Sequence, residues 1–135
     1  MFAIKKATEL TENAIGDKEK VEIIYKYIIN NIIYDWNKNV GVDYLPIIDK
    51  TIESKQGICY DFASLFASML RSLNIPTKLV TGNSTYVTKY HAWNEVYLDN
   101  KWVIIDTTVD NGLKKSNKKF NMIKKSSDYV KKYEY

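Results

Sequence analysis

The chain has 135 residues with one cysteine and one histidine, two residue types that together carry nucleophilic chemistry. Cys59 opens a predicted helix, where free backbone N–H groups and the positive end of the helix dipole favour a thiolate. His91 lies in a predicted strand, and Asp106 follows the apolar run Trp102–Ile105. An acid in such a place is costly unless it has a partner. The three residues therefore supply a nucleophile, a base and a carboxylate that orients the base.

The turn between the last two predicted strands decides whether His91 and Asp106 can meet. Asp99-Asn100 tolerates the positive φ angles of a two-residue type I′ loop. With that loop, Trp93 opposes Asp106, and His91 opposes Thr108. His91 and Asp106 then become diagonal neighbours on one face of the sheet. A loop one residue longer would place them on opposite faces.

Each of the three residues also has a structural alternative when it is considered alone. Cys59 could be a buried, unreactive thiol at a helix start, and His91 could be a hydrogen-bonded structural histidine. Asp106 could be an exposed strand-end residue that caps Thr107 or Thr108. The chemical interpretation therefore depends on all three coming together.

Hydrophobic periodicity predicts helices in the first half of the chain and strands after Pro76. Residues 36–56 lack strong periodicity, which is typical of a functional loop or lid. The predicted helices cover 2–14, 18–33 with Asp17 as N-cap, a short segment at 47–54, and 59–73, whose wide apolar belt indicates an enclosed helix. The predicted strands cover 78–81, 86–98 and 102–107, with a turn at 82–84.

Charge is distributed unevenly along the chain. The net charge is +4, and it divides into −2 for residues 1–113 and +6 for residues 114–135. The lysine-rich end is predicted to form a loop and short helix that wrap the surface. Arg71 is the only arginine, so we expect a solvated basic extension and no nucleic-acid partner.

Several short motifs resemble those of the transglutaminase-like superfamily. The segments 57–63 and 70–76 resemble its nucleophile helix, and Tyr34-Asp35 after the first long helix also matches. The run His91–Tyr97 resembles the histidine strand, and Trp102–Thr108 resembles the aspartate strand. The likeness covers about residues 10–110, and the order and spacing of the motifs make it specific to the superfamily but not to one reaction.

This resemblance implies an α+β, papain-like fold in which the nucleophile helix packs on an antiparallel sheet. The length of 135 residues points to one domain over residues 1–135. It implies Cys59 as nucleophile, His91 as general base and acid, and Asp106 as the orienting residue, with a thioester acyl-enzyme. The backbone N–H of Cys59 would help to hold the oxyanion. Tyr34 is the candidate for the second hydrogen-bond donor to the oxyanion, and Trp36 is the alternative. Both residue types are more often aromatic residues of the core.

We therefore expect a thiol acyltransferase or amide hydrolase acting on a protein or peptide, and we favour water as the acceptor. The alternative is a catalytically silent module that binds peptides in the same cleft. No acidic cluster for calcium is evident, so we expect no metal and no cofactor. No apolar run predicts a membrane span, and residues 1–20 lack the apolar core of an export signal. These patterns leave open the substrate, the oligomeric state and the location: cytoplasmic if Met1 is the natural start, cell-surface or secreted if the chain is an excised module.

Overall fold

A computed structural model describes residues 2–135 and places helices in the first half of the chain and strands in the second. The first half contains α1 (Phe2–Thr11), α2 (Gly16–Asn31), β1 (Ile33–Tyr34), α3 (Ile48–Ser54), β2 (Gln56–Gly57) and α4 (Cys59–Ser72). The second half contains β3 (Thr77–Ser84), β4 (Val87–Leu98), β5 (Lys101–Ile105), α5 (Thr107–Lys115), β6 (Ile123–Lys124), a 3₁₀ turn (Ser126–Asp128) and β7 (Tyr129–Glu134). Within these residues, no helix combines the length and the apolar character needed to cross a bilayer.

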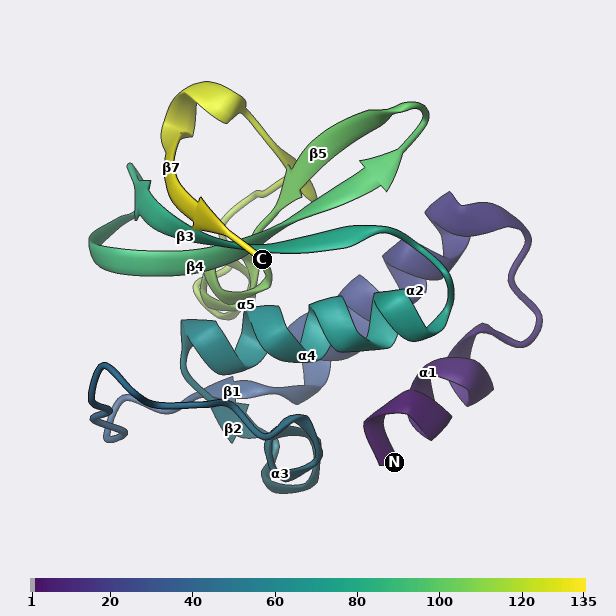
Figure 1. The fold of residues 1–135 in the computed structure, drawn as a ribbon, viewed down its shortest axis with the longest axis horizontal. Coiled ribbons are helices and arrows are strands. Elements are labelled where there is room, and N and C mark those ends of the chain that lie inside the picture. Colours follow the sequence, from purple (N-terminus) through teal and green to yellow (C-terminus); the bar gives the residue numbers. More distant parts are fainter. Residues whose placement is uncertain (1) are drawn as a thin grey trace.

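The sheet has five antiparallel strands in the order β6-β5-β4-β3-β7. Helices α1 to α4 lie together on one side of it, with α4 next to the sheet (Figure 1). Strands β1 and β2 form a separate parallel pair just before α4. The fold is therefore α+β, as predicted, with the N-terminal helices and α4 covering an antiparallel sheet.

Helix α4 is enclosed because almost every apolar side chain along it is buried. Phe62, Leu65 and Phe66 are fully buried, and they share one core with Val96 of β4 and Ile105 of β5. The sequence predicted this from the width of the apolar belt, since a helix that is apolar beyond one face needs cover on several sides. The enclosed body of α4 fixes the position of its first residue, Cys59.

The β4–β5 hairpin has the predicted two-residue loop. Asp99 and Asn100 adopt φ angles of 52° and 65°, and Leu98 pairs with Lys101. The pairing continues to Asn94 and Ile105, one residue before Asp106. The predicted register is therefore confirmed over the length of β5.

Strand β5 is shorter than predicted, so the pairing of His91 with Thr108 was wrong. The strand ends at Ile105, and Thr107 begins α5. Asp106 caps this helix, because its Oδ1 accepts the Val109 backbone N–H at 3.1 Å. The cap outweighs the strand preference of the β-branched residues that follow. The residue that pairs with His91 is Gly82 of β3.

Two further predictions were wrong, namely the turn at 82–84 and the N-cap at Asp17. Residues 82–84 continue β3, and the register shifts there on both sides of the strand. Asp17 is not the N-cap of α2 but lies in its first turn, where a carboxylate suits the helix dipole.

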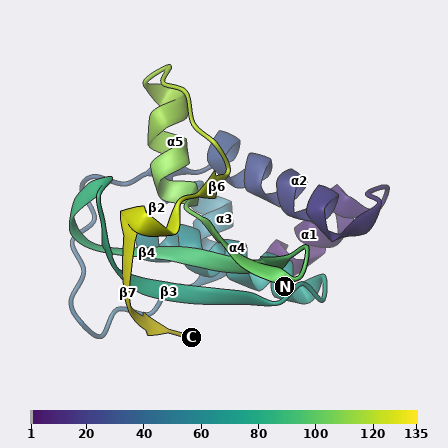
Figure 2. The ribbon, with the colours of Figure 1, turned by 90° about the horizontal axis from the view of Figure 1, so that it is seen from above.

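The C-terminal segment also differs from its prediction, because it ends in a strand instead of a surface helix. Strand β7 pairs with β3 and forms an edge of the sheet. In Figure 2 it is the yellow strand that leads to the C-terminus. Its pairing partner is far away in sequence, which explains why local periodicity did not reveal it.

Candidate active site

His91 and Asp106 form a buried pair. Nε2 of His91 lies 2.8 Å from Oδ2 of Asp106, and the two residues are 4% and 0% exposed. The contact predicted from the hairpin is present, although Asp106 reaches it from the start of α5 and not from within a strand. A buried carboxylate in this position fixes the imidazole tautomer and stabilises its protonated form.

Cys59 lies at the first position of α4 and is half-buried. Its side chain lies close enough to His91 to help raise the pKa of the imidazole. Because Nε2 of His91 faces Asp106, Nδ1 is the ring nitrogen that remains for the sulfur. The structure thus places Cys59 near the His91–Asp106 pair.

The environment of His91 favours the imidazolium. Burial is the largest single influence and lowers the pKa, but the hydrogen bonds and negative charges of Asp106 and Cys59 outweigh it and raise the pKa of His91 to about 10. An ordinary histidine has a pKa of about 6.5. His91 is therefore protonated at neutral pH, which places a cation next to the side chain of Cys59.

Tyr34 and Trp36 lie beside the start of α4, but they differ in exposure. Tyr34 is half-buried in β1, where it pairs with Gly57, whereas Trp36 is 86% exposed. Burial and then the nearby Cys59 raise the pKa of Tyr34, so its hydroxyl keeps its proton and can donate a hydrogen bond. The two rings lie 4.5 Å apart between centroids.

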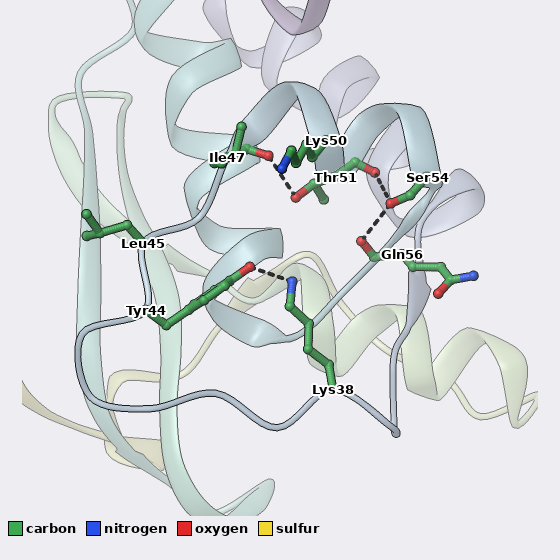
Figure 3. Close-up of a pocket in the computed structure, with 8 residues that line it drawn as sticks. All are labelled: Lys38, Tyr44, Leu45, Ile47, Lys50, Thr51, Ser54 and Gln56. Atoms are coloured by element: carbon green, nitrogen blue, oxygen red, sulfur yellow. Dashed lines mark hydrogen bonds between the residues drawn. The ribbon is translucent and has the colours of Figure 1, made fainter.

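A polar cluster ties the loop before α3 to the beginning of α4. Asp61 is fully buried and accepts hydrogen bonds from the Ile58 backbone N–H, the Tyr44 hydroxyl and the Lys38 ammonium. Lys38 and Tyr44 also contact each other and line a cavity of about 250 Å³ beside α3 (Figure 3). Gly57 is required here, because a Cβ at that position would lie 2.6 Å from the Cβ of Asp61.

Comparison with known proteins agrees with this fold. The family model described as the transglutaminase-like superfamily matches residues 4–107. The chain belongs to the transglutaminase-like superfamily.

Similar proteins are longer than this chain. UPF0252 protein MJ1282 of Methanocaldococcus jannaschii is 30% identical over 117 residues, covering 76% of this chain and 33% of that protein. Kyphoscoliosis peptidase of Mus musculus is also 30% identical over 117 residues, covering 78% of this chain and 18% of that protein. The crystal structure of a candidate cysteine protease from Cytophaga hutchinsonii superposes with a TM-score of 0.75 at 24% identity, covering 99% of this chain and 42% of that one. The chain thus spans about a third or less of these two sequence relatives.

Sequence reasoning missed two features around this transglutaminase-like site. The first is Tyr129, whose hydroxyl donates to Oδ2 of Asp106 at 2.9 Å. The second is the Lys38–Tyr44–Asp61 cluster. The role of Asp61 could have been predicted from the sequence, because an acid in the third position of a helix can accept a hydrogen bond from the N-cap N–H. Tyr129 carried none, since only the pairing of β7 with β3 brings it to the site.

No group of three or more cysteine, histidine or acidic side chains within residues 2–135 is arranged to hold a metal ion. The buried carboxylates of the region are instead engaged by hydrogen-bond donors from the chain itself, as at Asp61 and Asp106.

Proposed function

We propose that this chain is a thiol enzyme that cleaves or transfers amide acyl groups of proteins or peptides through a thioester. The observation that supports this most is the buried 2.8 Å contact between His91 and Asp106, with Cys59 close to the same imidazole. A histidine with a purely structural role would not need both a thiol at a helix N-terminus and a fully buried carboxylate as its neighbours. Cys59, His91 and Asp106 together match the requirements of a nucleophile, an acid–base group and an orienting group.

In the acylation step, the Cys59 thiolate attacks the carbonyl carbon of the amide. The negative charge that develops on the carbonyl oxygen would be held by the Cys59 backbone N–H, which as the first helical N–H has no partner within the helix. We propose the Tyr34 hydroxyl as the second donor. The His91 imidazolium gives its proton to the leaving amine as the C–N bond breaks, which leaves a thioester on Cys59 and a neutral imidazole.

In the deacylation step, His91 takes a proton from the acceptor, and the acceptor attacks the thioester carbon. Cys59 leaves as a thiolate, and the proton stays on His91, so the starting ion pair is restored. We propose water as the acceptor, because water is present at about 55 M and an enzyme must exclude it for an amine to compete. The half-buried position of Cys59 leaves the site open to solvent.

Alkylation by iodoacetamide tests the activated thiol directly, because the chain has one cysteine. We expect Cys59 to react at least about tenfold faster than a free thiol near neutral pH, and we expect His91→Ala to remove this advantage. Tyr90→Phe is a control, since Tyr90 is on the same strand and exposed. Reactivity that is ordinary and independent of His91 would contradict the proposal and would favour a peptide-binding module.

Intact-mass analysis tests the acyl chemistry. The protein is incubated with a pool of peptides, and an acyl adduct is sought on Cys59 and then chased with water or with a primary amine. We expect an adduct that water releases, and we expect Tyr34→Phe to lower its rate of formation more than Trp36→Phe does. An adduct released only by the amine would assign acyl transfer. A reactive thiol that never acquires an acyl group from any peptide would contradict the proposal.

A further inference from the structure

The carboxylate of Asp106 accepts hydrogen bonds from three parts of the chain. Its Oδ2 accepts from Tyr129 at 2.9 Å and lies 2.8 Å from Nε2 of His91. Its Oδ1 accepts the Val109 backbone N–H at 3.1 Å. Tyr129 and His91 therefore share one oxygen atom. Asp106 is fully buried, so bulk solvent does not reach its carboxylate.

Tyr129 is held in place by its strand and by an aromatic neighbour. It begins β7 and pairs with Ser84 of β3. Beyond this pair, β7 approaches β3 so closely that a Cβ on Gly82 would lie 2.0 Å from the Val130 carbonyl oxygen. The Tyr129 ring also packs on Trp93, with 4.8 Å between centroids. Trp93 in turn stacks on the His91 ring at 6.0 Å.

The Tyr129 hydroxyl stays protonated, so it acts as a hydrogen-bond donor. Burial, followed by the charge of Asp106, raises the pKa of Tyr129 far above its ordinary value. The acceptor in this contact is therefore the carboxylate, and the tyrosine contributes no negative charge of its own at neutral pH.

We propose that Tyr129 is a positioning residue that holds Asp106 and limits how tightly Asp106 retains the proton of His91. This inference rests on the proposed function. A hydroxyl donates a stronger hydrogen bond to a lone carboxylate than to one already paired with a cation. Tyr129 therefore stabilises the state with neutral imidazole more than the state with imidazolium. Neutral imidazole is the form that must accept a proton from water in deacylation.

Other titratable groups surround the His91–Asp106 pair, and the test described below alters none of them. Cys59 comes from α4, Asp110 from α5 and Tyr86 from the turn before β4. Behind Asp110 lie Tyr25 of α2 and Lys124 of β6. Removing only the Tyr129 hydroxyl leaves all of these groups in the chain.

The test replaces Tyr129 by phenylalanine and follows the imidazole by NMR, which is straightforward because the chain has one histidine. We expect the pKa of His91 in Tyr129→Phe to rise by about half a unit or more. We also expect release of the acyl group from Cys59 to slow several-fold, while alkylation of Cys59 persists. Tyr133→Phe is the matched control, since Tyr133 is on the same strand and exposed, and it should change neither quantity.

A second variant covers the case in which Tyr129→Phe fails to fold. Difluorotyrosine placed at position 129 keeps the ring and strengthens the donor, so the pKa of His91 should fall. An unchanged pKa in both variants, or a shift opposite to these signs, would overturn the inference and leave Tyr129 a structural residue. Failure of the proposed function would give a different result. In that case the reactivity of Cys59 in the parent protein would not depend on His91.

Discussion

The charge of His91 depends strongly on its neighbours, and this gives the residue a predictable pH dependence. Its pKa is raised from 6.5 to about 10 in the folded protein, although burial alone would lower it. We expect the imidazole to be mostly protonated at pH 8 by NMR. In Asp106→Asn the pKa should fall below that of the parent, because the carboxylate that opposes the effect of burial is gone.

The same shift predicts how His91 contributes to folding stability. A group whose folded pKa is above its unfolded pKa stabilises the fold fully below the unfolded value. This contribution should therefore be complete below about pH 6.5, decline as the pH rises, and be lost above about pH 10. Urea unfolding of the parent and of His91→Gln checks this. A difference between the two proteins that stays constant from pH 6 to pH 10 would contradict the assignment.

Gly57 is a second residue whose role follows from its contacts. Gly57 packs against Asp61, where a Cβ would lie 2.6 Å from another Cβ. We expect Gly57→Ala to destabilise the fold by about 1–3 kcal/mol, as overpacking usually does. Gly112→Ala is the control, because a Cβ there contacts nothing within 4 Å and the position is helical. It should be neutral or slightly stabilising in the same thermal unfolding measurement.

At the scale of elements, the sequence predicted the parts whose signals are local. The helix that starts at Cys59 follows from its apolar belt, and the hairpin register follows from Asp99-Asn100. The prediction failed where distant contacts decide the structure. Strand β7 exists because β3 offers an edge to it, and residues 82–84 remain in β3 because Gly82 allows β7 to approach. No local pattern within residues 114–135 encodes that partner.

The loop between β1 and α3 illustrates an element held by a few side chains. Lys38 and Tyr44 bind the buried Asp61 at the start of α4, while Trp36 and Leu45 of the same loop are exposed. With little buried apolar surface of its own, the loop depends on these polar contacts.

We therefore expect Lys38→Met to speed amide hydrogen exchange within residues 36–47 several-fold, with little change in α4. The measurement is exchange followed by mass spectrometry. Lys50→Met is the matched control, because Lys50 lines the same cavity but is not among the residues that contact Asp61. If the two variants loosened the loop equally, Lys38 would not be the side chain that holds it.

At the scale of the whole molecule, the basic C-terminal segment packs against the acidic remainder of the chain. Lys131 contacts Glu95 of β4, and Lys124 is buried against Asp110 of α5. These ion pairs neutralise part of the +6 charge of residues 114–135, which were predicted to form a solvated extension. The segment is therefore partly integrated into the fold, and Lys124 and Tyr129 both lie behind the candidate active site.

Lys124 connects three elements through one carboxylate. Its ammonium contacts Asp110 of α5, which also accepts a hydrogen bond from Tyr25 of α2, and Lys124 itself belongs to β6. Both members of the ion pair are almost completely buried. We expect Lys124→Met to destabilise the whole molecule by about 3–5 kcal/mol, because Asp110 would be left as an uncompensated buried charge.

Two controls separate the loss of this charge pair from a general effect of removing a lysine. Lys125→Met changes the neighbouring exposed residue and should have almost no effect on urea unfolding. Adding Asp110→Asn to Lys124→Met should recover part of the lost stability, since the unpaired charge is then gone while Tyr25 still has an amide oxygen to bind. A double variant less stable than Lys124→Met would mean that the lysine stabilises the fold by packing and not by neutralising Asp110.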